Sequence, residues 1–369
     1  MIAPAPAGDA TAVPDGQRSL GVEEEFLLVD PETGKPRAVA TAVLRAADDG
    51  GLTGELQREQ IETNTEPCRT LAELHKDLLE TRRRAREAAH SIGVELAALA
   101  TSPLPADPTV SPAPRYRRMV ETFGLTGVEQ LTCGCHVHVA VDSDEEGVAV
   151  LDRIRPWLAP LLAISANSPF WGGEDSGYAS FRGQVWGRWP SAGPSDLFGS
   201  VESYRATVQG MLRTGTVLDE AMVYFEARLS RQHPTVEIRV ADVCRDPADA
   251  VLVAGLTRAL VETAVRDWKA GTQPDPVPTP VLRLASWRAS RSGLDDVLVD
   301  PLTWRPAPAA QVLRGLVEHA AEALEQAGDL DVVRDLITDV VRRGTGAARQ
   351  RAVHARGEGL AAVVADATA

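Results

Sequence analysis

Polar residues alternate with apolar ones in four short segments that lie far apart along the chain. The alternating pairs are Glu23 and Glu25, Gln60 and Glu62, His136 and His138, and Glu237 and Arg239. Most of the residues between the members of each pair are apolar. Side chains at positions i and i+2 of a strand point to the same face of a sheet. The pattern therefore predicts four strands that share one polar face.

Strands and helices are expected to alternate irregularly along the chain. The predicted strands and extended segments cover about 20–30, 55–65 and 132–141, together with the segment around Glu237. The predicted helices cover about 71–100, 143–165, 201–213, 248–270, 309–327 and 330–343. Thr70 followed by Glu73 is the capping-box pattern that opens the first of these helices. This order favours an α+β fold with an antiparallel sheet over a regular βαβ arrangement.

The segments between these elements differ in composition. Residues 1–18 are rich in Ala, Pro and Gly and are predicted to be disordered, whereas 102–114 reads as a proline-rich loop. Residues 167–194 combine many aromatic residues with many glycines, which favours an ordered functional loop over a linker. We therefore expect a single catalytic domain over 19–345 and a C-terminal tail over 346–369 with no assigned structure.

Four arginines, Arg82, Arg83, Arg84 and Arg86, lie in the predicted helix over 71–100. A run of charge on a helix is usually a solvated face, and this interpretation is favoured over a phosphate-binding role.

Composition narrows the function classes. The chain has 369 residues and a formal net charge of −14, which argues against general nucleic-acid binding. It contains only three lysines, so a phosphate-binding site would have to be built from arginine. No apolar run reaches the length of a membrane span, the N-terminal segment lacks signal-peptide features, and four cysteines are too few for a disulfide framework. The expected location is the reducing cytoplasm, without nucleic-acid or membrane partners.

The acids on the predicted common face indicate a divalent-metal site. Glu23 and Glu25 lie between apolar residues, which favours a buried site over a solvated charge cluster. Several carboxylates on one face repel each other unless a cation neutralises them.

The segment CGCHVHVAV also allows a zinc site that mixes Cys and His ligands. Alternation places Cys133 and Cys135 on the face opposite His136 and His138, so a core role for the cysteines is favoured. We also expect one of the two histidines to have a core role.

Glu237 and Arg239 could form a simple cross-strand ion pair, but their placement on the polar face favours a site.

Neither a glycine-rich phosphate loop nor a GxSxG motif is present. Carboxylates that bind magnesium, together with arginines, are typical of phosphoryl transfer from a nucleotide.

Seven segments in the same order resemble the carboxylate–amine ligase family, also called glutamate–cysteine ligase type 2. They are GVEEEFLLVDPETG, QREQIETNTEPCRTLAEL, HVHVAV, SANSPFWGGEDSGYASFRGQVWGRWPSAGP, PTVEIRVADV, SWRASRSGLDDVLVDP and GTGAARQR. The resemblance implies a glutamine-synthetase-like fold in which a curved antiparallel sheet with flanking helices binds ATP and Mg²⁺ (or Mn²⁺). It also implies amide formation through an acyl phosphate that an amine then attacks.

The resemblance also assigns roles to individual residues. The implied metal ligands are Glu23, Glu25, Glu62, His136 and Glu237. Arg239 and Arg182 are implied to act on the phosphates or the substrate carboxylate, and Arg288 and Arg291 to contact the nucleotide. The implied partners are a small-molecule carboxylate and an amine, with a homo-oligomer possible.

The chain departs from the family pattern before Glu237. It reads Tyr224-Phe225-Glu226 and Arg228-Leu229-Ser230, where the family usually has Trp-Trp-Asp and Arg-Pro-Ser. The identities of the acid and the amine that the protein joins are therefore left open. A small-molecule kinase with the same fold and a non-catalytic nucleotide or metabolite sensor are the alternatives to a ligase.

Overall fold

A seven-stranded antiparallel sheet forms the centre of the protein, in a computed structural model that describes residues 17–47 and 51–368. Its main path runs β2-β3-β1-β5-β9-β8, and β4 pairs separately with β1. The strands of the sheet are β1 (Leu20–Val29), β2 (Leu52–Gly54), β3 (Gln60–Asn64), β4 (Glu95–Ala97), β5 (Gly134–Ala140), β8 (Ala227–Leu229) and β9 (Thr235–Asp242). Two separate hairpins pair β6 (Phe170–Trp171) with β7 (Glu174–Asp175), and β10 (Val297–Val299) with β11 (Pro306–Pro308). The predicted α+β class is confirmed.

The four strands that carry the alternating polar residues are neighbours in the order β3-β1-β5-β9. Their register places Glu25 opposite Glu62, Glu23 opposite His136, and His138 opposite Glu237. A register irregularity between Cys135 and Val137 on β5 interrupts its pairing with β9. Residues distant in sequence therefore become direct cross-strand neighbours on one face.

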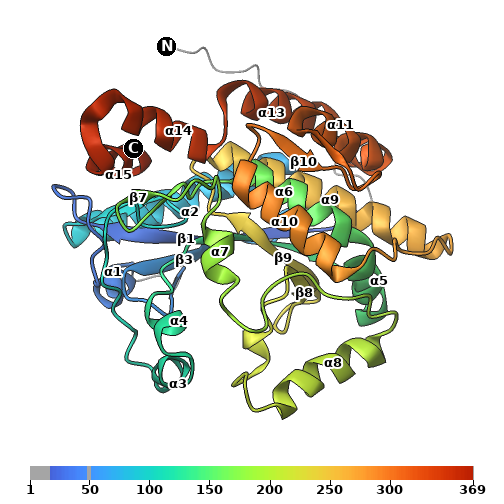
Figure 1. Cartoon of the computed structure of the whole chain (residues 1–369), viewed down its shortest axis with the longest axis horizontal. Coiled ribbons are helices and arrows are strands. Elements are labelled where there is room, and N and C mark those ends of the chain that lie inside the picture. Colours follow the sequence, from blue (N-terminus) through green and yellow to red (C-terminus); the bar gives the residue numbers. More distant parts are fainter. Residues whose placement is uncertain (1–16, 48–50, 369) are drawn as a thin grey trace.

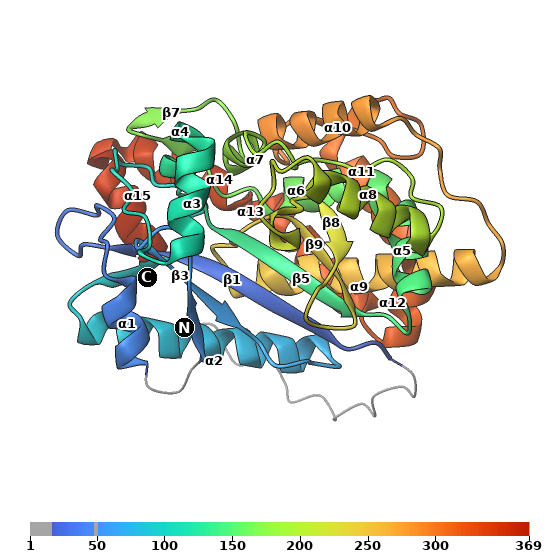
Figure 2. The same ribbon diagram turned by 90° about the horizontal axis from the view of Figure 1, so that it is seen from below.

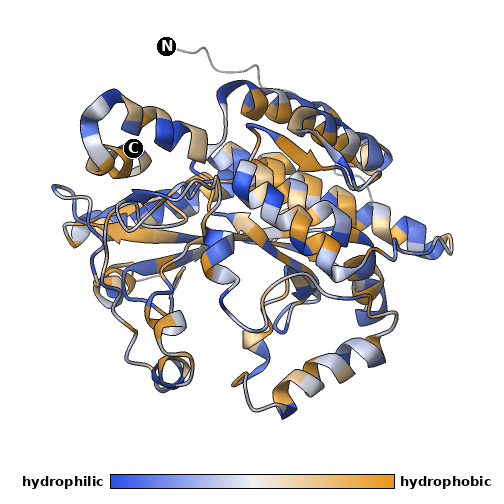
Figure 3. Ribbon diagram, viewed as in Figure 1, coloured by the Kyte–Doolittle hydropathy of each residue, from blue (hydrophilic) through white to orange (hydrophobic). Residues whose placement is uncertain are grey.

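Most of the helices cover the opposite, apolar face of the sheet (Figures 1 and 2). The helices are α1 (Ala40–Ala46), α2 (Leu71–Ser91), α3 (Pro114–Phe123), α4 (Leu125–Val128), α5 (Asp144–Ile154), α6 (Leu158–Ser165), α7 (Arg182–Trp186), α8 (Val201–Arg213), α9 (Pro247–Lys269), α10 (Thr279–Ser292), α11 (Ala309–His319), α12 (Ala321–Ala327), α13 (Leu330–Arg343), α14 (Gly346–Val353) and α15 (Gly359–Thr368). Helix α9 contacts β1 and β5, α6 contacts β9, and α2 contacts β1 and β3. Figure 3 shows apolar residues along the sheet and on the helices that pack against it.

Helices α3 and α8 lie on the other side of the sheet, and β1 and β5 are visible between them in Figure 2. The core beneath the sheet includes Val137, Ile238, Leu74 and Leu252, all of which are buried. Because the core packs against the apolar face, the polar face of the sheet remains available for a site.

Several predicted boundaries differ from the structure. Helix α2 ends at Ser91, and the rest of the expected 71–100 helix contains the short strand β4. The expected 143–165 helix divides into α5 and α6 around a 3₁₀ turn that contains Pro156, whose ring is incompatible with an uninterrupted helix. Helices α3 and α4 were not predicted, although Pro114 at a first helical position is a start signal. The Thr70–Glu73 capping box is confirmed.

The solvated interpretation of the arginine run is wrong for Arg82. This residue follows Leu74 and Leu78 at four-residue intervals, so it lies on the buried stripe of α2. Its guanidinium donates to Glu24 Oε1 at 2.6 Å and Oε2 at 2.8 Å. Arg83 lies on the exposed side of the same helix, as expected, and pairs with Glu80 and Glu87.

Both chain ends contribute contacts within the described part of the protein. The predicted disorder of 1–18 falls mostly on residues outside the described range, but Arg18 pairs with Glu146 at 2.6 Å and Glu262 at 2.9 Å. The C-terminal segment is helical, and Val363 of α15 packs with Phe170 and Val353.

Within the described residues, no helix is both long and apolar enough to cross a membrane.

Candidate active site

A cavity of about 940 Å³ covers the polar face of the sheet. Strand periodicity and register together bring all eight alternating polar residues to its wall: Glu23, Glu25, Gln60, Glu62, His136, His138, Glu237 and Arg239. Side chains from α3, α7 and the segment before β8 close the cavity on the other side. The predicted common polar face is therefore a concave site.

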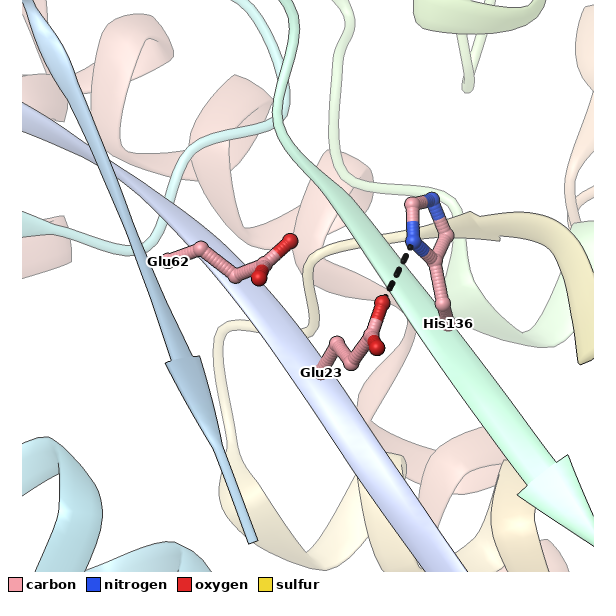
Figure 4. A group of neighbouring side chains, drawn as sticks. All are labelled: Glu23, Glu62 and His136. Carbon is pink, nitrogen blue, oxygen red and sulfur yellow. Dashed lines mark hydrogen bonds and ion pairs between the residues drawn. The ribbon is translucent and has the colours of Figure 1, made fainter. Parts of the chain in front are cut away.

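Glu23 lies at the centre of this face, between two histidines of β5. Its Oε2 is 3.3 Å from His136 Nδ1, and its Oε1 is 3.1 Å from His138 Nε2. Burial and the nearby charge of Arg239 lower the pKa of His136 to about 3, so this imidazole is neutral at pH 7. Burial alone would raise the pKa of Glu23, but its contacts with the two histidines outweigh this and lower it. Figure 4 shows Glu23, His136 and Glu62 pointing toward one another from three adjacent strands.

Glu25, Glu55 and Glu62 form a second group of carboxyls in the cavity. Burial, followed by repulsion from Glu23 and Glu25, raises the pKa of Glu62 to about 7. Burial likewise raises the pKa of Glu25, and burial with repulsion from Glu25 raises that of Glu55 well above its usual range. Gly134 donates its N–H to Glu25 Oε2 at 2.6 Å. Thr53 and Asn64 donate to Glu62 at 2.8 and 3.2 Å, and the charges of Arg182 and Arg239 act on Glu25, but burial outweighs these contacts and the pKa of each acid stays raised.

Glu237 is in a different electrostatic setting. Arg228 donates to Glu237 from Nε to Oε2 at 2.7 Å and from Nη2 to Oε1 at 3.1 Å. Arg239 also contacts Oε1. Burial and the nearby Arg228 lower the pKa of Arg239 to about 9, which leaves it protonated at pH 7. A cation that binds Glu237 would compete with these two guanidinium groups for its carboxylate oxygens.

The donor set fits a hard divalent cation. Within the part of the chain that the structure describes, three overlapping groups have ligand atoms within 4.8 Å of one another: Glu23–Glu62–His136, Glu23–His138–Glu237 and Glu25–Glu55–Glu62. The Nε2 atom of His136 is buried and has no hydrogen-bond partner among the described residues, so its capacity to bind a ligand is unused. Carboxylate-rich sites of this kind suit magnesium or manganese.

The cysteines do not join this donor set. Cys133 and Cys135 are buried in hydrophobic clusters, as the alternation predicts. The possible core role for one histidine is not observed, since both His136 and His138 line the cavity.

Three arginines that the sequence assigned to the site lie outside the cavity lining. Arg182 is buried behind it and donates to the backbone carbonyls of Val240 at 3.4 Å and Arg239 at 3.3 Å. Its charge still acts on Glu25. Arg288 and Arg291 lie on α10 and line a separate, smaller surface pocket.

Sequence reasoning missed Glu55 and Tyr116. The predicted functional loop over 167–194 contributes Trp186 and Trp189, which form an aromatic wall with Tyr116 and Tyr224. Glu55 lies outside any alternating pattern, because it precedes β3 in an irregular segment. Arg228 and Tyr224 line the cavity from the segment where the chain departs from the family pattern, which is the departure that left the acid and the amine open. Tyr116 had no signal, since its helix was not predicted.

Comparisons with known proteins give a consistent result. The model of the family described as glutamate-cysteine ligase family 2 matches residues 19–366. The chain is 54% identical over 353 residues to “Putative glutamate--cysteine ligase 2” of Streptomyces coelicolor, covering 94% of this chain and 97% of that protein. It is 53% identical over 339 residues to “Putative glutamate--cysteine ligase 2-1” of Streptomyces avermitilis, covering 90% and 94%.

Solved structures show the same fold at low sequence identity. A glutamate–cysteine ligase of Francisella tularensis in complex with AMP superposes with a TM-score of 0.70 at 14% identity, covering 96% of this chain and 88% of that one. A bifunctional glutathione synthetase of Pasteurella multocida gives a TM-score of 0.67 at 17% identity, covering 95% of this chain and 52% of that one.

Proposed function

Because this chain belongs to glutamate-cysteine ligase family 2, we propose that it is an ATP-dependent ligase that joins a carboxylate to an amine as an amide. One observation carries the proposal. Among the described residues, six glutamates, three histidines and four arginines line a single cavity, and residues of these types can bind a metal–nucleotide complex beside a carboxylate.

The proposed reaction has two steps. A carboxylate oxygen of the acid bonds to the γ-phosphorus of ATP while the bond from that phosphorus to ADP breaks. The amine nitrogen then attacks the acyl carbon, inorganic phosphate leaves, and the nitrogen releases one proton. The products are an amide, ADP and phosphate.

The residues of the cavity have separate roles in this proposal. Glu23, Glu25, Glu62 and His136 would hold magnesium or manganese, and Glu237 would join them once Arg228 or Arg239 releases it. A bound ion would neutralise charge on the phosphate oxygens during phosphoryl transfer. Arg239 and Arg228 offer guanidinium forks to phosphate or carboxylate oxygens.

Arg182 acts from outside the cavity. Its guanidinium holds the β9 backbone and supplies positive charge to Glu25, which makes it a positioning residue. Arg288 and Arg291 line a separate pocket, so we do not assign them a contact with a nucleotide in the main cavity.

Isotope transfer tests the proposed reaction. The protein is incubated with magnesium, ATP, a panel of amines and carboxylic acids carrying ¹⁸O in both carboxyl oxygens. We expect equal amounts of amide, ADP and phosphate, with one ¹⁸O in each phosphate. Glu62→Gln should abolish this turnover, and Glu145→Gln, an exposed change on α5, should not.

Other outcomes separate the alternatives. A stable phosphorylated product without amide would indicate a kinase, whereas nucleotide binding without turnover of any pair would indicate a sensor. Release of AMP with ¹⁸O in the AMP would replace the acyl phosphate with an acyl adenylate.

A further inference from the structure

Two buried guanidinium groups lie against one indole ring at the wall of the cavity. The guanidinium carbon of Arg239 lies over the Trp186 ring, 5.6 Å from its centroid, and that of Arg182 lies over the same ring, also at 5.6 Å. Both arginines are buried, and Trp186 is partly exposed in the cavity lining. A cation within about 6 Å of an aromatic ring is attracted to its face, more strongly where water is excluded. Trp186 is therefore placed to hold both arginine side chains.

Hydrogen bonds leave part of each guanidinium unsatisfied. Arg239 contacts Glu237 through Nη1, but its buried Nε has no hydrogen-bond partner among the described residues. The Nε of Arg182 is in the same state. Burying a donor without a partner costs free energy, so the face of Trp186 supplies an attraction that the hydrogen bonds do not.

Arg228 shares Glu237 with Arg239 but has a different second anchor. Its Nη1 donates to the backbone carbonyls of Ala221 at 3.1 Å and Val223 at 3.0 Å. If a metal ion took the carboxylate of Glu237, these carbonyls would still hold Arg228. The ring of Trp186 would still hold Arg239, because that contact does not involve the carboxylate.

The indole ring belongs to a well-anchored helix. Val185 of α7 is buried, and the N–H of Arg182 donates to Ser168 Oγ at 3.0 Å. The ring centroids of Trp186 and Tyr224 are 4.7 Å apart. A ring that packing fixes before a ligand arrives lowers the entropic cost of ordering the side chains it contacts.

We propose that Trp186 is a positioning residue of the ligase. Its ring holds the guanidinium of Arg239 at the cavity wall, so that the guanidinium stays available to a phosphate or carboxylate oxygen of the substrates when a metal ion occupies Glu237. This inference rests on the proposed ligase function, which it deepens by naming the residue that maintains one of its anion-binding arginines.

The variant of the arginine itself defines the readout. Calorimetry on the full chain with magnesium gives the affinity for a non-hydrolysable ATP analogue, and steady-state rates give KM and kcat for an acid that the parent protein accepts. Arg239→Gln identifies which of these quantities depends on the arginine. Trp186→Leu should worsen the same quantity about tenfold, and Trp186→Phe, which keeps a ring, should recover most of that loss.

A double-mutant cycle separates positioning from a general loss of structure. In the Arg239→Gln background, Trp186→Leu should cause less than about a threefold further loss, because the partner of the ring is already gone. Trp171→Leu is the matched control, since the Trp171 ring lies 5.8 Å from the guanidinium of the exposed Arg188 and outside the cavity lining. Thermal melting checks that each variant is folded.

NMR of the arginine Nε–H groups tests the contact without turnover. The ring current of Trp186 should shift the Arg239 signal, which is identified by its loss in Arg239→Gln. We expect the shift to persist when magnesium is added and to change in Trp186→Phe. If Trp186→Leu fails to fold, this signal and the Phe variant decide the question.

Three results would overturn the proposal: additive losses in the cycle, no effect of Arg239→Gln on affinity, KM or kcat, or an Arg239 signal that is indifferent to Trp186. A parent protein that turns over no acid–amine pair would instead reject the ligase function, while the binding cycle and the NMR signal would still show whether Trp186 positions Arg239.

Discussion

Three consecutive glutamates on β1 lie in two opposite environments. Glu24 points into the core and is completely buried, yet Arg82 binds both of its oxygens and also donates to the carbonyl of Cys244 at 2.7 Å. Glu23 and Glu25 point into the cavity, where other acids surround them. Neighbouring glutamates therefore differ: Glu24 forms an ion pair with Arg82 in the core, whereas Glu25 lies in the cavity beside Glu55 and Glu62.

The difference shows how to distinguish a structural acid from a functional one. Burial alone does not, because all three side chains are largely withdrawn from water. What differs is compensation: Arg82 matches the charge of Glu24, whereas the contacts of Glu25 and Glu62 in the cavity do not offset burial, and the pKa of each is raised. Acids that the fold leaves uncompensated require an external cation, which makes them candidates for a site.

The largest effect is expected when the buried ion pair between Arg82 and Glu24 is broken. Arg82→Ala leaves Glu24 buried without a partner and should lower the free energy of unfolding by about 3–5 kcal/mol. Urea unfolding measures this loss. Arg83→Ala, on the exposed side of the same helix, should change it by less than about 1 kcal/mol. Similar losses in the two variants would show that the buried pair is not structural.

Glu226 is an intermediate case, since among the described residues the one side chain that donates to its carboxyl is Ser286, whose hydroxyl lies at 2.8 Å. Burial raises its pKa to about 7 from an ordinary value of 4.5. Between these values the folded state binds more protons than the unfolded state, so stability falls as pH rises from about 4.5 to about 7. The loss contributed by this group is up to about 3 kcal/mol above pH 7.

Glu226→Gln keeps an acceptor for Ser286 and cannot ionise. The variant should therefore be more stable than the parent protein at pH 8 and about equal to it at pH 4. Urea unfolding across this pH range is the measurement, with Glu145→Gln as the exposed control. A variant less stable than the parent at pH 8 would mean that the ionised carboxylate is itself stabilised, through Arg283 for example.

The smallest effect on stability is expected from a substitution among the acids of the cavity. Glu62→Gln removes one repelling charge, so the metal-free protein should gain about 1 kcal/mol, a rise in melting temperature of roughly 2–4 °C. Magnesium should stabilise the parent protein and have little effect on the variant. Destabilisation of the metal-free variant would place Glu62 with Glu24 as a structural acid.

The sequence predicted much of the polar face because its signal is local. Period-two alternation selected Glu23, Glu25, Glu62 and His136, and the capping box located the start of α2. The prediction of α8 at 201–213 agrees with the structure, and that of α9 agrees to within one residue. Such patterns arise from backbone geometry, which neighbouring residues determine largely by themselves.

Other features were decided only by the tertiary structure. Nothing near Arg82 in sequence shows that Glu24 is its partner, 58 positions away. Arg182 and Arg288 carry the same charge as Arg239, but packing placed one behind the cavity and the other outside it. Glu55 and Tyr116 joined the site from segments with no periodic signal. Periodicity determines which face a residue occupies, whereas the partner that meets that face depends on strand register and on contacts between distant segments, which no local pattern encodes.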